Sequence, residues 1–251
     1  MNILFAGEDA APGSGRYLLA VLKAMRASVT HVPALQRLSA RALQRSSYAG
    51  ILLSDFPRAH ASMAAQRAIV AQVHEGAGLL MIGGWGSFSG PFGCWKGSLI
   101  EQLLPVTCHG RDDRKNFPSG ALIVLRRPHG MWRGLSFVTP PVICGLNLLR
   151  PKPSSQVLLG ARPMIPRLHT GGTLRVSLSP QEYPLLVVGA SSDQRVAALA
   201  TDAAPHWCGG LVDWGTRSLR LPVTKRIDAE VGDRYVQLFS CLIRWLTRSE
   251  T

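Results

Sequence analysis

The stretch that decides the fold is GLLMIGGWGSFSGPFG, residues 78–93. Residues 78–82 form an uncharged, apolar run, which is typical of a strand buried on both faces of a parallel sheet. A glycine-rich segment follows directly. Within it, residues 86–90 read GSFSG and match G-x-S-x-G, the pattern of a serine nucleophile on a sharp strand-to-helix turn.

The context of this match argues against a nucleophile at Ser89. A nucleophile elbow places its serine immediately after a strand and starts a helix directly behind it. Here the expected strand ends near Ile82, and Pro91 and Gly93 delay the next helix to about Ser98. We therefore expect a glycine-rich turn with another role.

The residues that follow this strand are better candidates for binding. Ligands of open parallel sheets lie beyond the carboxyl ends of the strands, and a glycine-rich turn lets backbone N–H groups approach an anion or oxyanion. We predict that Gly84, Trp85 and Gly86 bind a ligand. The alternative is that the glycines only permit a tight exit from the strand.

Upstream of this stretch, strands and helices alternate, which implies a mostly parallel sheet flanked by helices, with right-handed crossovers. The expected strands span 2–6, 28–32, 50–54 and 78–82, and the expected helices span 14–27, 39–45, 61–75 and 98–104.

Downstream, the pattern changes to short β-type segments separated by Pro and Gly. These segments span 121–125, 141–146, 156–159 and 173–178. We interpret residues 106–180 as a β-rich elaboration of a single domain that spans residues 1–251. Segments 184–188 and 195–200 predict a hairpin across the spacer 189–194, and residues 230–247 predict an amphipathic helix.

The composition is that of a folded globular protein, with 46% hydrophobic and 17% charged residues. No run approaches the roughly 18 apolar residues that span a bilayer, and the N-terminus lacks the basic segment of a signal peptide. Five cysteines, with no C-x-x-C pair, predict reduced thiols rather than disulfides or a zinc site. We expect a cytoplasmic protein with no membrane partner, no metal and no cofactor.

The net charge of +13 favours anionic partners. The arginines are dispersed along the chain, however, and no helix-turn-helix, zinc-finger or RNA-binding motif accompanies them. A basic scaffold or nucleic-acid-associated protein is therefore an alternative interpretation that we do not favour.

Four further polar residues follow expected strands. Asp9 and Asp55 come after the first and third strands, and Asp202 and His206 come after segment 195–200. His206 is a candidate general base or ligand contact, with Asp202 orienting its ring. The alternative is a turn in which Asp202 caps a backbone N–H and His206 is partly buried.

Four aromatic residues crowd the glycine-rich loop: Trp85, Phe88, Phe92 and Trp95. Aromatic side chains there can wall a pocket for a sugar or a nucleobase. The other interpretation is that they cover the sheet edge or fill a subunit interface, so the chain is also a candidate homo-oligomer.

Three segments resemble a bacterial family of class I glutamine amidotransferase-like proteins related to the ThuA-like, trehalose-utilisation group. They are GLLMIGGWGSFSG with the helix stop IEQLLPV, YPLLVVG, and RVAALATDAAPHW. The resemblance covers most of the chain. It implies a flavodoxin-like α/β sheet with the site at the strand tips.

The chain departs from the active members of that superfamily at two places. They carry a cysteine in a G-x-C-x-G elbow where this chain has Trp85 between Gly84 and Gly86. Their catalytic histidine is followed by x-Glu, whereas His206 is followed by Trp207 and Cys208. Attack on glutamine needs a thiol, its base and an oxyanion hole together. We therefore do not expect glutaminase activity.

The sequence leads to one main functional hypothesis. The chain is a glutamine amidotransferase-like protein that binds a small polar or anionic ligand at the strand tips. Gly84, Trp85 and Ser87 form the floor, Asp202 and His206 form the opposite wall, and Asp9 and Asp55 lie at the rim. The enzymatic alternative is a hydrolase that uses His206 with Ser87 or with an activated water.

Overall fold

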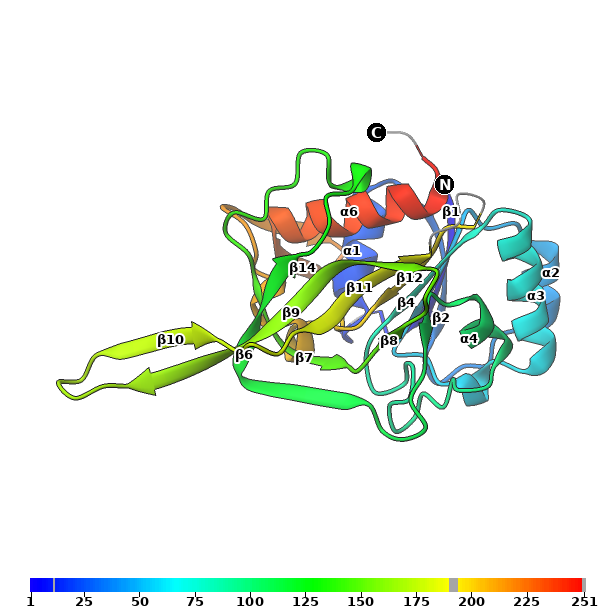
Figure 1. The fold of residues 1–251 in the computed structure, drawn as a ribbon. Helices are drawn as coiled ribbons and strands as arrows, with labels where there is room; N and C mark the ends of the chain where they lie inside the picture. Colours follow the sequence, from blue (N-terminus) through cyan, green and yellow to red (C-terminus); the bar gives the residue numbers. More distant parts are fainter. Residues whose placement is uncertain (11, 190–193, 250–251) are drawn as a thin grey trace.

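The computed structural model describes residues 1–10, 12–189 and 194–249. Its centre is a ten-stranded sheet with the order β2-β1-β3-β4-β12-β11-β9-β6-β7, to which β10 adds by pairing with β9 (Figure 1). The strands are β1 (Asn2–Gly7), β2 (Ser28–Pro33), β3 (Gly50–Ser54), β4 (Gly78–Ile82), β6 (Arg114–Leu125), β7 (Val142–Asn147), β9 (Ser155–Leu168), β10 (Leu174–Leu178), β11 (Tyr183–Gly189) and β12 (Val196–Leu199).

One half of this sheet is parallel and the other half is antiparallel. β2, β1, β3, β4 and β12 run parallel to one another. β11, β9, β6 and β7 continue the sheet with antiparallel pairs. Every residue of β3 and β4 is buried, because helices cover both faces of the parallel half. This is the flavodoxin-like arrangement that the sequence predicts.

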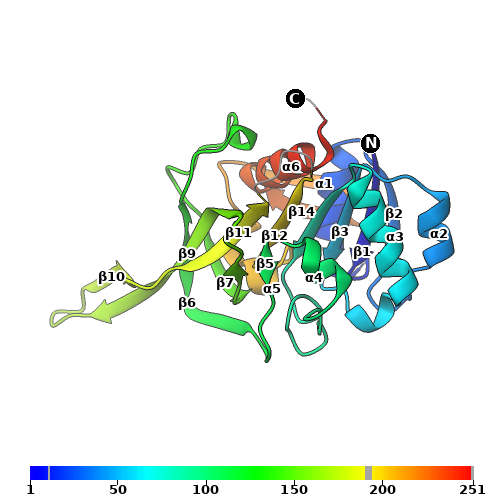
Figure 2. The ribbon, with the colours of Figure 1, turned by 45° about the vertical axis from the view of Figure 1, so that its right-hand side comes forward.

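The helices form two layers. α1 (Arg16–Ala24) contacts α6 (Asp233–Thr247), whereas α3 (Met63–His74) contacts both α2 (Ala40–Arg45) and α4 (Leu99–Leu103). Figure 2 shows α2, α3 and α4 grouped away from α1 and α6. Serine N-caps start α2, α3 and α4: the Oγ atoms of Ser39, Ser62 and Ser98 accept backbone N–H bonds from the residue three positions on.

The remaining elements are short. They are β5 (Val106–Thr107), β8 (Arg150–Pro151), α5 (Pro205–Cys208), β13 (Ser218–Pro222), β14 (Asp228–Gly232) and the 3₁₀ turns η1 (Arg58–His60), η2 (Gly130–Trp132) and η3 (Gly209–Leu211). β13 and β14 form a hairpin that contacts α1. No helix among the described residues is long and apolar enough to cross a membrane.

The predicted hairpin of segments 184–188 and 195–200 is confirmed, since β11 pairs antiparallel with β12. Residues 190–193 of its spacer lie outside the described residues. The helix expected over 230–247 begins later, at Asp233. Residues 230–232 instead belong to β14, where Val231 is buried and pairs with Leu219 of β13.

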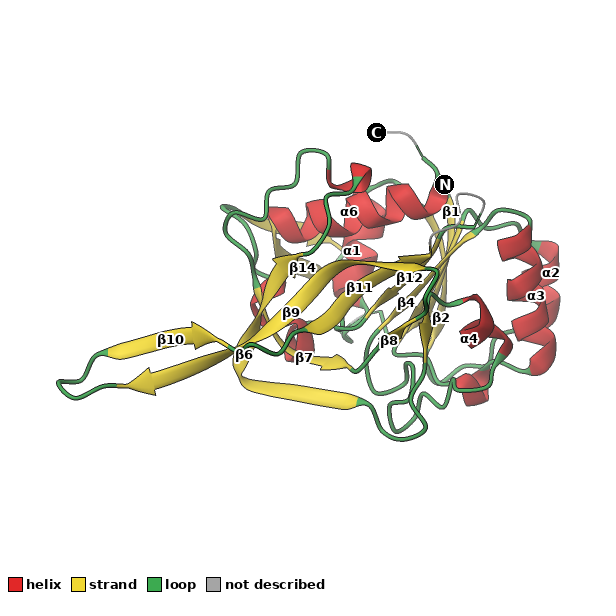
Figure 3. Ribbon diagram, viewed as in Figure 1, coloured by secondary structure: helices red, strands yellow, loops and turns green. Residues whose placement is uncertain are grey.

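The strand expected at 156–159 is much longer than predicted. β9 runs for 14 residues, and its second half pairs with β10 as a two-stranded ribbon that projects from the body of the molecule (Figures 1 and 3). Pro163, Pro166 and Arg167 interrupt the apolar alternation of β9 and hide its continuation from a pattern search. β10 is correspondingly exposed along almost its whole length.

Candidate functional site

Polar residues gather where the parallel strands end. Glu8 follows β1, Asp55 follows β3, the glycine-rich turn follows β4, and Asp202 and His206 follow β12. The carboxyl ends of parallel strands meet at one edge of the sheet. The sequence therefore brings these groups together from four separate parts of the chain.

Hydrogen bonds of Asp55 and Ser87 stabilise the turn after β4. Asp55 has a left-handed backbone with φ of +49°, and its carboxylate accepts the Gly86 N–H. Its own N–H donates to Ser87 Oγ over 3.0 Å, and Ser87 Oγ donates to the Ile82 carbonyl over 2.5 Å. The Ser87 side chain is thus buried with its proton committed to the main chain.

These bonds give Ser87 a structural role. A nucleophilic serine must pass its proton to a base, and no contact joins Ser87 to His206 among the described residues. The pairing of Ser87 with His206 therefore has no support in the geometry. Ser89 likewise donates its hydroxyl to the His109 carbonyl over 2.6 Å, in agreement with its exclusion as a nucleophile.

The glycine amides of the turn after β4 donate hydrogen bonds within the chain. The Gly83 N–H donates to the Leu199 and Thr201 carbonyls, and the Gly84 N–H donates to Asn147 Oδ1 over 2.9 Å. The Gly86 N–H is taken by Asp55. Because the chain itself satisfies these three donors, the bonds favour the alternative interpretation, in which the glycines permit a tight exit from the strand.

Gly84 is a glycine for a steric reason. Its φ is +148°, and a Cβ atom at this position would lie 2.5 Å from Asp55 Oδ1. The side chain of Asn147, in β7, also binds Gly84: its Nδ2 donates to the Gly84 carbonyl over 3.2 Å. The same Nδ2 donates to Asp113 Oδ1 over 2.7 Å. Burial raises the pKa of Asp113 to about 6, although its bonds to Asn147 and to the Ser89 amide oppose that shift.

His206 and Asp202 form a close pair. Asp202 Oδ2 lies 2.7 Å from His206 Nε2, and Oδ1 accepts the Ala204 N–H over 2.9 Å. Asp202 therefore contacts the imidazole and also caps its own turn, so both sequence interpretations describe part of its role. The bond to Asp202 raises the pKa of His206, and partial burial opposes it.

Asp55 and Glu8 complete an acidic cluster beneath this pair. Burial raises the pKa of Asp55 to about 6, the Gly86 amide lowers it, and the nearby Asp202 raises it. Burial, followed by the charges of Asp202 and Asp55, raises the pKa of Glu8 well above its ordinary value. Glu8 is consequently favoured as the neutral acid.

Glu8 is the residue that sequence reasoning missed. The sequence pattern predicts Asp9 as the site residue after β1, but Asp9 is exposed, and no contact joins it to Asp202, Asp55 or His206 among the described residues. The missing signal was register: Glu8 is the first residue beyond Gly7, the last residue of β1, and it is Glu8, one position before Asp9, that interacts with Asp202 and Asp55.

A cavity of about 790 Å³ opens above the cluster. Most of its wall is apolar, and its polar lining groups include Asp55, His60 and His206. The residues that line it are Ala34, Leu35, Asp55, Pro57, Ala59, His60, Trp85, Gly86, Pro91, Phe92, Cys94 and His206. Trp85 faces the cavity, with its ring centre 6.4 Å from that of Phe92 and 4.0 Å from the Arg114 guanidinium carbon.

The thiol of this cavity is Cys94. Cys94 is exposed and has a left-handed φ of +52°, and its side chain makes no hydrogen bond to His206 or to any other described residue. A thiol nucleophile needs a positioned base within hydrogen-bond reach. Cys94 shares the cavity with His206 without such a contact.

This fold and this site define an α/β protein of the class I glutamine amidotransferase-like type. Residues 13–221 match the model of the family described as "Putative glutamine amidotransferase", and the chain belongs to that family. No curated protein is similar enough to the chain to count as a match.

Solved structures agree with this fold. A cytoplasmic protein of Salmonella typhimurium, STM3548, superposes with a TM-score of 0.72 at 22% identity, over 98% of this chain and 99% of its own. A second, STM1381, gives 0.64 at 28% identity, over 83% and 91%. A ThuA-like protein of Parabacteroides merdae gives 0.59 at 12% identity, over 100% and 90%. The family model confirms the resemblance to glutamine amidotransferase-like proteins, and the solved structures, a ThuA-like protein among them, confirm the predicted fold.

Proposed function

We propose that this chain is a cytoplasmic glutamine amidotransferase-like protein that has lost thiol chemistry and binds a small polar ligand in the strand-tip cavity. One observation carries the proposal. Trp85 occupies the turn after β4, and the amides of this turn are bonded to Asp55, Asn147 and β12. The nucleophile and the oxyanion hole of a glutaminase are both lacking at that turn.

The lining supports a neutral, hydroxyl-rich ligand such as a sugar. Trp85 and Phe92 are 46% and 60% exposed and present ring faces that can cover an apolar sugar face. Asp55 and His206 supply acceptors and a donor for hydroxyl groups at the base. An anionic ligand is less favourable there because Asp55, which lines the cavity, and the neighbouring Asp202 place negative charge at its base.

Thermal-shift measurements with a panel of neutral mono- and disaccharides test this proposal. A ligand at about 100 times its Kd adds about 2.7 kcal/mol, which raises the Tm of a chain of this size by several degrees. Trp85→Ala should remove the shift. The matched control Leu174→Ala, on the projecting ribbon, should retain it. A shift of equal size in Trp85→Ala would place the ligand elsewhere.

Glutaminase assays test the loss of chemistry separately. We expect no ammonia release from glutamine above the background rate. Turnover that disappears in Cys94→Ser would contradict the proposal, because it would show that Cys94 is a working nucleophile.

The hydrolase alternative survives only in its water-activating form. The Asp202 contact occupies Nε2 of His206, while Nδ1 makes no hydrogen bond to a described residue and belongs to a side chain that lines the cavity. An imidazole oriented by a carboxylate is the arrangement of a general base. Hydrolysis of an activated ester that is lost in His206→Ala and retained in Cys94→Ser would favour this alternative.

A further inference from the structure

A second pocket lies at the opposite edge of the sheet. Arg195 directly precedes β12 and lines this pocket, whereas His206 follows the other end of that strand. The pocket has a volume of about 380 Å³ and lies between η2, the start of β12 and the last turns of α6. It shares no lining residue with the strand-tip cavity. Its function is therefore a separate question.

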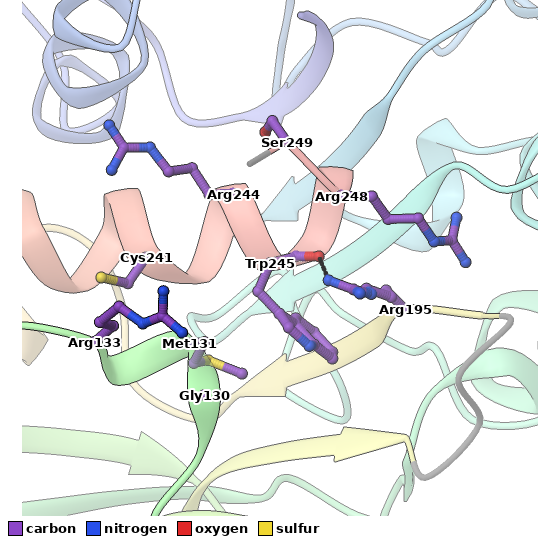
Figure 4. A pocket seen from close by; sticks show the side chains of 9 residues that line it. All are labelled: Gly130, Met131, Arg133, Arg195, Cys241, Arg244, Trp245, Arg248 and Ser249. Atoms are coloured by element: carbon purple, nitrogen blue, oxygen red, sulfur yellow. Dashed lines mark hydrogen bonds between the residues drawn. The ribbon is translucent and has the colours of Figure 1, made fainter. Parts of the chain in front are cut away.

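Arginine dominates its lining. The lining includes Trp245 and four arginines, Arg133, Arg195, Arg244 and Arg248, and no carboxylate is among the described lining residues. Figure 4 shows Trp245 and Arg195 side by side on one side of the pocket and Arg133 beside Met131 on the other. Arg244 and Arg248 extend from α6 in opposite directions. Four arginines thus belong to the lining of one concave surface.

One of these arginines is held in place by the fold. Arg195 Nη1 donates to the Trp245 carbonyl over 2.6 Å, and its guanidinium carbon lies 5.5 Å from the centre of the Trp245 ring. Arg195 is only partly exposed, so the pocket presents a guanidinium of fixed position next to an aromatic surface. Such preorganisation lowers the entropy cost of holding a ligand.

Two other arginines are unrestrained. The side chains of Arg133 and Arg244 are exposed and make no hydrogen bond or ion pair with a described residue. In Figure 4 the Arg244 guanidinium extends away from the pocket, so it must rotate about its side-chain torsions to close on a ligand. Arg248 is engaged with the Gly76 carbonyl over 2.7 Å and is not counted among the binding groups.

The titration of nearby groups reflects this concentration of positive charge. Burial lowers the pKa of Arg195, and the charge of Arg248 lowers it further. Burial, followed by the charge of Arg195, also lowers the pKa of His129, which contacts Trp245 edge to face. A multivalent anion in the pocket would offset this repulsion.

We propose that this pocket is a binding site for a small phosphate-bearing anion of more than one phosphate group. Arg195 and Arg133 hold its oxygens next to Trp245, and Arg244 closes over it. Guanidinium forks match phosphate oxygens in pairs, and several cations around one pocket suit a ligand that carries several negative charges. The volume suits a di- or triphosphate moiety of a small molecule.

Isothermal titration calorimetry of the full chain with inorganic triphosphate, at about 0.15 M NaCl, tests this site. The double variant Arg133→Gln/Arg244→Gln removes two exposed cations. The matched control Arg167→Gln/Arg175→Gln removes the same charge from the projecting ribbon, where neither side chain has a described partner. We expect saturable binding with one site per chain, at least tenfold weaker binding in the pocket variant, and a change of less than twofold in the control.

Three results would overturn the proposal. They are the absence of saturable heat up to about 10 mM triphosphate, equal affinities in all three proteins, and an equal loss in both variants, which would identify a general charge effect. Quenching of tryptophan fluorescence by triphosphate gives an independent readout. It should be lost in Trp245→Phe, and quenching that persists there would place the ligand away from this pocket. A small-anion site would also be refuted if an oligonucleotide bound in a manner that required Arg133 and Arg244 while triphosphate did not bind.

Discussion

Asp55 has two roles, one in stabilising the turn after β4 and one in lining the cavity. Its carboxylate holds the Gly86 amide, and it also lines the cavity next to His206. The left-handed conformation of Asp55 and the positive φ of Gly84 allow the two chain segments to approach so closely. Backbone strain of this kind is retained where surrounding contacts over-determine it, and such places cluster at binding sites.

Replacing Gly84 with Ala should destabilise the protein by about 3 kcal/mol, because Cβ would clash with the Asp55 carboxylate in addition to the cost of the backbone conformation. The matched control is Gly97→Ala. Gly97 also has a positive φ, of +72°, but a Cβ atom there meets nothing within 4 Å. Gly97→Ala should therefore lower the free energy of unfolding by only about 1–2 kcal/mol. Urea denaturation measures both, and equal losses would show that the clash is relieved.

Asp55 also predicts a pH dependence. Its folded pKa of about 6 lies above its ordinary value of 3.8, so the native state binds more protons than the unfolded state between these values. Stability should therefore fall as pH rises from about 4 to about 6. Asn at this position keeps the shape and accepts a left-handed φ. Asp55→Asn should gain about 1–3 kcal/mol over wild type at pH 7 and nothing at pH 4. Urea denaturation at both pH values measures this, and an equal difference at the two would exclude the carboxylate as its source.

At the scale of elements, the antiparallel half of the sheet positions the site that the parallel half carries. Asn147 ends β7, yet its side chain reaches the turn after β4 and links Gly84 to Asp113. Trp207 of α5 likewise donates from Nε1 to Asn116 Oδ1 of β6 over 2.7 Å. The β-rich segment therefore supports both the glycine turn and the helix that carries His206.

Asn147→Ala should cost about 3–5 kcal/mol, because it leaves the Gly84 amide and carbonyl and the Asp113 carboxyl group buried without this partner. The control Asn2→Ala loses one exposed bond to the Ser47 carbonyl and should cost less than about 1 kcal/mol. Chemical denaturation measures the two losses. Similar values would mean that water replaces the Asn147 side chain.

Sequence patterns predicted the parallel half well and the antiparallel half only in outline. The strands at 50–54 and 78–82 are apolar runs bounded by Gly and polar residues, so their limits are readable. The β13–β14 hairpin is absent from the sequence prediction because neither of its strands carries a long apolar run. The site residues could be predicted only where the end of the preceding strand could be predicted. His206, Asp202 and Asp55 follow correctly placed strands, whereas the side-chain bonds of Ser87 and Asn147 depend on long-range packing.

At the scale of the whole molecule, charge repulsion acts against the fold. The chain has 28 basic and 15 acidic residues, and several of the acidic ones lie in the buried cluster or in the turn network instead of pairing with surface arginines. Self-repulsion of a net charge of this size destabilises the compact state, and salt screens it.

Raising NaCl from about 20 to about 200 mM should therefore raise Tm by a few degrees. Sodium triphosphate at the same ionic strength should raise the Tm further, because the arginine pocket binds this anion. The extra increment should vanish in Arg133→Gln/Arg244→Gln. Differential scanning calorimetry measures these shifts, and a Tm that falls with NaCl would contradict the role of self-repulsion.

The β9–β10 ribbon contains trypsin cleavage sites that lie outside the hydrophobic core. Arg167 and Arg175 lie opposite each other near its exposed end. Cleavage there divides the chain into one part with β1 to β9 and another with β11, β12 and α6, and these parts share the central sheet through the β9–β11 and β4–β12 pairs. The two halves should remain associated after the cut, and when produced separately they should reassemble into one folded protein.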